Sequence, residues 1–279
     1  MVLESIISPV TAEKRPLRLF MIGIIYAAVS IFLSLWIFEE QSSLISVFLI
    51  VIASVPLFYL TLRMEEEKDI ELNEEKGILK EHSKAILFLM FLFFGVVVAY
   101  AIAYVLLPSH IVSNLFNLQQ TTINKINSNV SNFDVLSKIF LNNIKVLTFC
   151  ILFSLFYGAG AIFILVWNGS VISTAIGNFI RESLSSYASV LGFSALAKYL
   201  HVFSLGLLRY SIHGIPEIAA YFIASLAGGI FSVAIVRHDL SSKKFEKIIF
   251  DVSNLILISV TILFVAAVLE VYITPRIFS

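Results

Sequence analysis

Charged residues are scarce in this chain. They make up 14% of its 279 residues, and the formal net charge at pH 7 is zero. An average soluble domain has about a quarter of its residues charged. The balanced charge gives no reason to expect a nucleic acid or another polyanion as a partner. Cysteine occurs once, at Cys150, which excludes an intramolecular disulfide bond.

The sequence also lacks the common catalytic motifs. It contains no His-Glu-x-x-His, no Gly-rich phosphate-binding loop and no Gly-x-Ser-x-Gly elbow. Ser194, in a Gly-Phe-Ser triplet, could form a serine hydrolase only together with a distant histidine, and such a triplet arises easily by chance. A metal site on His213 and Glu217 would need a further ligand, for which His201 or Glu182 would be the candidates. We therefore expect no enzymatic activity, no cofactor and no metal ion.

Long apolar runs dominate what is present. Hydrophobic residues make up 59% of the chain and the mean hydropathy is +0.95. Several runs exceed the 18 residues that indicate a transmembrane helix, and the alternation typical of a membrane β-barrel is absent. The first run is too long for the core of a signal peptide. The sequence thus predicts an all-α, polytopic membrane bundle of about seven spans, at 17–38, 44–62, 85–107, 144–167, 187–208, 215–236 and 252–273.

The stretch 168–212 is the least regular part of this pattern. The apolar segment 170–180 is too short to cross alone, and Arg181 follows it. The next run, 187–208, has Lys198, His201 and Arg209 on one helical face. That face fits an interfacial helix as well as a span whose charges point inward. We expect broken or interfacial helices here, as in discontinuous membrane helices.

Two regions are expected on this basis. Residues 1–79 form a transmembrane hairpin followed by a charged cytoplasmic segment, in which 63–84 holds five basic and eight acidic residues. This segment is expected to be a solvated linker, with a helical hairpin as the alternative. Residues 80–279 form the membrane core, with a long Asn-rich loop at 109–141 that lies partly in the interface.

Small residues spaced four apart predict the closest helix contacts, because they let neighbouring backbones approach. One such stripe lies in the third span and a second in the sixth, and paired glycines interrupt the fourth. These residues are Gly95, Ala99 and Ala103; Ala220, Ala224, Gly228 and Ser232; and Gly158 and Gly160.

Basic residues predict the orientation, because Lys and Arg gather in cytoplasmic loops. The N-terminal segment, the segment 63–84 and the loop 237–247 are rich in them. The turn 39–43 has none and the loop 109–141 has two. With about seven spans, this places the N-terminus in the cytoplasm and the C-terminus outside.

The most distinctive polar stretch is His213-Gly214-Ile215-Pro216-Glu217, at the mouth of a membrane helix. In a helix, residues four apart share a face, so His213 and Glu217 can meet. A carboxylate within lipid is costly, roughly 2.5–3.5 kcal/mol for comparable charges, and therefore needs a partner. The alternative is a plain helix start, with Pro216 in its first turn and Glu217 favoured by the helix dipole.

Two further polar stretches lie at membrane depth, at the two ends of the run 144–167. They are Asn142-Asn143 and Asn168-Gly169. We predict a single intramembrane cluster, for binding or for structure, formed by Asn143, Asn168, Gly169, His213, Gly214 and Glu217.

These residues carry a family resemblance. The Asn-Asn pair before an apolar run, Gly158-x-Gly160, Asn168-Gly169, the His-Gly-Ile-Pro-Glu motif and Gly228-Gly229 resemble the stage II sporulation protein M family from about residue 80 onward. The leading hairpin is absent from shorter bacterial members. The resemblance implies an integral membrane protein of the cell envelope without established enzymatic activity, which in endospore formers acts at engulfment beside partners that remodel peptidoglycan.

Two functions remain open. The first is a non-enzymatic scaffold or complex subunit, with the lipid bilayer and other membrane or envelope proteins as partners, a homo-oligomer as a further option and no nucleic acid. The second is a membrane permease or lipid exporter that uses His213 and Glu217, a pair able to exchange protons near neutral pH.

Overall fold

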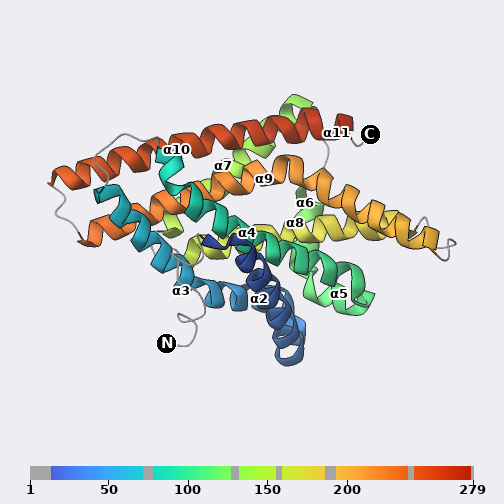
Figure 1. Cartoon of the computed structure of the whole chain (residues 1–279). Helices are drawn as coiled ribbons and strands as arrows, with labels where there is room; N and C mark the ends of the chain where they lie inside the picture. The colour runs from blue at the N-terminus through green and yellow to red at the C-terminus, as the bar shows by residue number, and fades with distance from the viewer. Residues whose placement is uncertain are drawn as a thin grey trace.

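The computed structural model describes residues 14–71, 78–126, 132–154, 159–185, 193–237 and 242–277. These residues form helices and short turns, without any strand (Figure 1), as predicted for an all-α protein. Seven of the described helices are long and apolar enough to cross a membrane. In chain order the elements are α2 (Pro16–Ile37), η2 (Glu39–Gln41), α3 (Ser42–Glu71), α4 (Ile78–Leu106), α5 (Ser109–Leu115), α6 (Asn117–Ile126), α7 (Asn132–Ser154), α8 (Ala159–Ser185), α9 (Phe193–Arg237), α10 (Lys243–Val268), η3 (Leu269–Ile273) and α11 (Thr274–Ile277).

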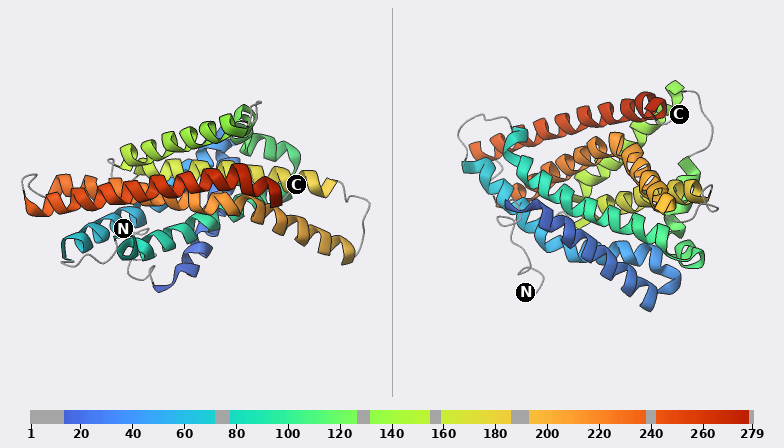
Figure 2. Two further views of the ribbon diagram at one scale, coloured as in Figure 1. Left: turned by 90° about the horizontal axis from the view of Figure 1, so that it is seen from above. Right: turned by 45° about the vertical axis from the view of Figure 1, so that its right-hand side comes forward.

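Helix α9 is the centre of the bundle. Its second half, from Ala220 to Ala234, is almost entirely buried. It contacts α3, α4, α7, α8 and α10, and α10 runs back along it (Figures 1 and 2). A helix that is apolar all round is expected in such a central position. The small residues of the second stripe lie here, and Gly228 packs directly against Ile151 and Ser154 of α7.

The first small-residue stripe meets α2. A Cβ atom added to Gly95 would lie 2.0 Å from the carbonyl oxygen of Phe20, and one added to Gly23 would lie 2.1 Å from that of Leu92. The backbones of α2 and α4 therefore cross in direct contact. Glycine is required at both positions, since any side chain would force the helices apart. This crossing packs the N-terminal hairpin onto the rest of the bundle.

The apolar run 144–167 is not one span, contrary to the prediction. Helix α7 ends at Ser154 and α8 begins at Ala159, so the run is divided between two helices. Gly158 lies outside the described residues, and Gly160 lies in the first turn of α8. Glycine has a low helix propensity, so this pair favours an ending inside the run. Continuous hydrophobicity hid this division, because the sequence is apolar on both sides of the point where α7 ends.

The prediction that the apolar segment 170–180 is too short to cross the membrane does not hold, because the segment belongs to a longer helix. It is part of α8, a helix of 27 residues that is long enough to cross. The stretch 168–212 is helical on both sides of residues 186–192, which lie outside the described residues. The resulting spans are 16–37, 39–68, 82–106, 135–154, 161–184, 201–236 and 243–277.

Helix α9 also joins two segments that were predicted to be separate. It is a single helix of 45 residues with Pro216 in its interior, so Pro216 does not lie in the first turn of a helix. Proline removes one backbone hydrogen bond and its ring clashes with the carbonyl four residues earlier, which bends a helix. The bend of α9 is clear in Figures 1 and 2. At about 67 Å, α9 is far longer than a 30 Å apolar layer is thick.

The charged segment 63–84 is not a solvated linker in its described parts. Helix α3 continues to Glu71 and α4 begins at Ile78. The side chains of Glu65 and His82 are fully buried, with His82 Nδ1 2.6 Å from Glu65 Oε2. Lys68 Nζ also donates a hydrogen bond of 2.6 Å to Glu65. The acidic and basic residues here thus join the ends of two spans.

The loop 109–141 is largely helical. Helices α5, α6 and the start of α7 occupy it, and Gln119 of α6 is fully buried. The Gln119 amide accepts a hydrogen bond from Ser43 Oγ at 2.7 Å and donates one to Ser170 Oγ at 3.1 Å. This amide therefore ties α6 to both α3 and α8.

Candidate functional site

A polar cluster forms where the bend of α9 meets the end of α10. His213 Nδ1 lies 3.3 Å from Thr274 Oγ1, and the Thr274 hydroxyl donates to the carbonyl of Leu269 at 3.0 Å. The contact between His213 and Thr274 thus joins α9 to α11, and the tautomer of the imidazole decides which of the two donates the hydrogen bond.

Glu217 lies one turn further along the same face of α9. Its Oε1 accepts a hydrogen bond of 2.9 Å from the hydroxyl of Tyr221, which is fully buried. His213, Glu217 and Tyr221 are spaced four apart, which places all three on one side of the helix. The tyrosine supplies a partner that a carboxylate at membrane depth needs.

The third component is the π-helical turn η3. It inserts one extra residue per turn at the end of α10 and places Glu270 near Glu217, close enough for the two carboxyl groups to interact electrostatically. Single π-helical turns occur often at functional sites. Glu270 is thus a second acidic residue in the region of Glu217.

Asn143 comes from α7. Its side chain is 6% exposed. Ser154, three helical turns later, donates to the carbonyl of Ser225 at 2.9 Å and packs on Gly228. Three turns before Gly228 is Glu217, and α7 and α9 run in the same direction (Figure 2). Asn143 therefore lies on a buried face of α7, three turns before the point where α7 packs on α9.

The other predicted residues lie elsewhere. Asn168 is in the middle of α8, where its amide donates to the carbonyl of Ile164 at 2.8 Å within the same helix. Gly169 packs against the ring of Phe93 in α4. The structure thus brings His213 and Glu217 into one cluster, while Asn143 lies on a buried face of α7, Asn168 bonds within α8 and Gly169 belongs to the α4–α8 contact.

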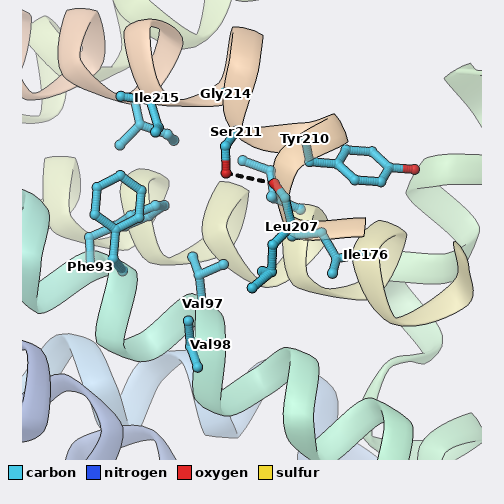
Figure 3. A pocket seen from close by; sticks show the side chains of 12 residues that line it. Phe93, Val97, Val98, Ile176, Leu207, Tyr210, Ser211, Gly214 and Ile215 are labelled. Atoms are coloured by element: carbon cyan, nitrogen blue, oxygen red, sulfur yellow. Dashed lines mark hydrogen bonds between the residues drawn. The ribbon is translucent and has the colours of Figure 1, made fainter. Parts of the chain in front are cut away.

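Gly214 faces an apolar cavity of about 260 Å³ between α4, α8 and α9 (Figure 3). A Cβ atom on Gly214 would meet nothing within 4 Å. Phe93 and Ile215 face each other across the cavity in Figure 3, and Leu207 points toward Val97. Tyr210 lines this cavity and its ring centroid lies 6.3 Å from that of His213, so the apolar cavity and the polar cluster are neighbours on α9.

The prediction missed three members of the polar cluster: Tyr221, Glu270 and Thr274. Glu270 carried a signal, since it is the only acidic residue of the run 252–273. Tyr221 stands four residues after Glu217, which is the spacing of a helical neighbour. Thr274 had no signal, because its role depends on how α10 ends.

The cluster's side chains can hold and pass protons and accept hydrogen bonds. Within the described ranges, no group of three His, Cys, Asp or Glu side chains is arranged to hold a metal ion. The chemistry that these residues offer is therefore that of hydrogen bonding and proton binding among an imidazole, two carboxyl groups and a phenol.

Comparison with known proteins identifies the family. Residues 84–275 match the model described as Stage II sporulation protein M. The chain belongs to the stage II sporulation protein M family. The predicted resemblance is confirmed. The sporulation protein M match includes the whole polar cluster, from Asn143 to Thr274, and begins after the N-terminal hairpin.

A curated relative of this sporulation protein M chain is an uncharacterized protein of Methanocaldococcus jannaschii. It is 30% identical over 142 residues, which cover 50% of this chain and 70% of the relative. No solved structure matches the chain. Family membership and the apolar helices together make this an integral, multi-pass membrane protein.

Proposed function

We propose that the protein is a non-enzymatic scaffold, or subunit of a membrane complex, in the cell envelope. The observation that supports this most is the closure of the polar cluster on the chain's own residues. His213 meets Thr274 and Glu217 meets Tyr221. The His213–Thr274 contact joins α9 to α11, and polar contacts between membrane helices fix their register, whereas the Glu217–Tyr221 hydrogen bond lies within α9. On this proposal the cluster holds α9 against α10 so that the outer helices present a constant surface.

Helix α2 offers one such surface. Met21, Ile25, Val29, Phe32 and Trp36 are all exposed and recur at helical spacing. A face of this kind meets lipid or a helix of another protein. Other membrane or envelope proteins, or a second copy of the chain, are the partners proposed for it. The proposal includes no cofactor and no nucleic acid.

The scaffold proposal is tested by purification from native membranes in mild detergent, followed by mass spectrometry. Wild type, Glu217→Gln and the control Glu40→Gln, an exposed residue in the turn after α2, are compared. We expect a stoichiometric protein partner with wild type and control, and its loss with Glu217→Gln. Recovery of all three as partner-free species would contradict the proposal.

A second candidate function is that of a permease or lipid exporter. The bend of α9 at Pro216 supports it, because an apolar cavity and a polar cluster lie beside each other near this bend. Bent or interrupted helices beside a site are common in transporters. Uptake or efflux in proteoliposomes should then fall strongly in Glu217→Gln and not in Glu40→Gln. Transport that is equal in both variants would remove Glu217 from the mechanism.

A further inference from the structure

The cavity beside Gly214 is apolar almost throughout. Its walls come from α4, α8 and α9 and include Phe93, Val97, Ile176 and Leu207. Ser211 is one of two lining residues with a hydroxyl, and it donates to the carbonyl of Leu207 at 2.6 Å (Figure 3). The other, Tyr210, points its ring away from the space (Figure 3). A cavity of this kind does not attract water.

The size of the cavity fits a hydrocarbon chain. Engineered apolar cavities of roughly 150 Å³ hold a benzene molecule. At about 260 Å³, this one has room for a longer apolar segment. Ile215 lines it and is also 43% exposed, so the cavity reaches the apolar outer surface of the bundle. In a membrane, acyl chains surround that surface.

Arg209 supplies a positive charge near the residues that line the cavity. Arg209 precedes the lining residue Tyr210, and its guanidinium lies 5.3 Å from the ring centroid of Phe179, one turn beyond Ile176. Among the described residues, no acidic side chain forms an ion pair with Arg209. Charged residues inside spans are costly and generally mark sites. Arginine is also the residue best suited to bind a phosphate group.

Two further charges lie nearby on α8. Arg181 donates to the carbonyl of Leu107 and its guanidinium lies 5.4 Å from the ring centroid of Tyr104. Glu182 interacts electrostatically with Tyr104 and Tyr210. Glu270 interacts electrostatically with Tyr210 as well. The case for an anionic ligand therefore depends on the guanidinium of Arg209.

We propose that the cavity binds one acyl chain of an anionic membrane phospholipid, with the phosphate of its headgroup on Arg209. The lipid enters from the surrounding bilayer past Ile215, and Gly214 leaves the space that the chain fills. This proposal concerns only lipid binding, so it is compatible with both candidate functions and depends on neither.

Photocrosslinking tests this proposal. The purified protein is placed in nanodiscs of phosphatidylcholine with a small fraction of phosphatidylglycerol that carries a diazirine at mid-chain. Labelled peptides are then mapped by mass spectrometry. We expect labelling to concentrate on the wall residues of α4, α8 and α9, and to fall at least fivefold in Gly214→Leu. A Cβ atom at this position would meet nothing within 4 Å, so the leucine side chain begins in open space and occupies part of the cavity.

The control for the cavity is Val236→Leu, at an exposed position of the same helix, which should label like wild type. For the headgroup, Arg209→Gln should remove most of the preference for phosphatidylglycerol over a diazirine phosphatidylcholine, whereas Lys244→Gln should keep it. Labelling spread evenly over the bundle, or unchanged in Gly214→Leu, would overturn the acyl-chain site. Unchanged preference in Arg209→Gln would overturn the headgroup assignment.

Circular dichroism and the melting temperature show that each variant is folded. Melting also gives a second measure of binding, because a ligand that binds only the folded state raises its stability. Phosphatidylglycerol should raise the melting temperature of wild type in detergent and leave that of Gly214→Leu unchanged. An equal rise in both variants would count against the site.

Discussion

At the scale of single residues, the membrane setting makes each polar contact informative. The hydrogen bond between Tyr221 and Glu217 and the contact between His213 and Thr274 both lie within spans. Buried polar groups without partners are costly, so removing one partner should cost more than removing both. The same logic led from the sequence to His213 and Glu217, but it could not supply Tyr221 or Thr274 as the partners.

The Glu217–Tyr221 pair gives the first prediction. Tyr221→Phe should lower the free energy of unfolding by about 0.5–2 kcal/mol, since one hydrogen bond of a buried acid is lost. Glu217→Ala should cost at least as much, and the double variant should cost less than the sum. Reversible unfolding in mixed micelles measures all three. Additive effects, as expected for the distant control Tyr26→Phe with Glu217→Ala, would show that the pair is not coupled.

At the scale of elements, the same residue type has opposite roles in different helices. Gly95 is a contact point, where an added Cβ would strike the backbone of α2. Gly214 faces empty space on the bend of α9. The sequence pattern at spacing four marked Gly95 as a packing residue. It could not show that Gly214 borders a cavity, because that depends on the course of α4 and α8.

A matched pair of alanine variants follows. Gly95→Ala should lower the melting temperature, since the α2–α4 crossing must widen to admit a methyl group. Gly214→Ala should leave it unchanged or raise it, because alanine favours a helix over glycine by about 0.5–1 kcal/mol where space is free. Tryptophan fluorescence of the two variants during heating compares them. Equal shifts in the same direction would contradict the different surroundings described for these glycines.

At the scale of the whole molecule, composition was enough to predict a helical membrane bundle, but not where its spans end. The prediction from hydrophobicity merged parts of α7 and α8 into one span at 144–167. It also divided α9 into two spans near Pro216. Both errors have one physical cause. An apolar sequence shows no boundary between two consecutive helices, and proline can bend a helix without ending it. The site differed accordingly, because His213 and Glu217 lie in the middle of α9 and Thr274 lies beyond the end of α10.

The orientation of the seven spans in the membrane is still a prediction, with the N-terminus in the cytoplasm and the C-terminus outside, and it can be tested. Basic residues at 237–247 and near the N-terminus favour the cytoplasm for these segments. In a Cys150→Ala background, cysteines at Glu40 and Arg276 should react with a membrane-impermeant thiol reagent in intact cells. A cysteine at Lys244 should react only after permeabilisation. The reverse pattern would show that the N-terminus is outside.

The central claim is that the bend of α9 and the end of α10 together build one intramembrane polar site. Cysteine cross-linking tests it most directly, in the Cys150→Ala background. His213→Cys with Thr274→Cys should cross-link rapidly with a short bifunctional thiol reagent in native membranes. His213→Cys with Phe264→Cys, about 15 Å further along the helix, should not. Cross-linking of the second pair as fast as the first, or of neither, would contradict the site.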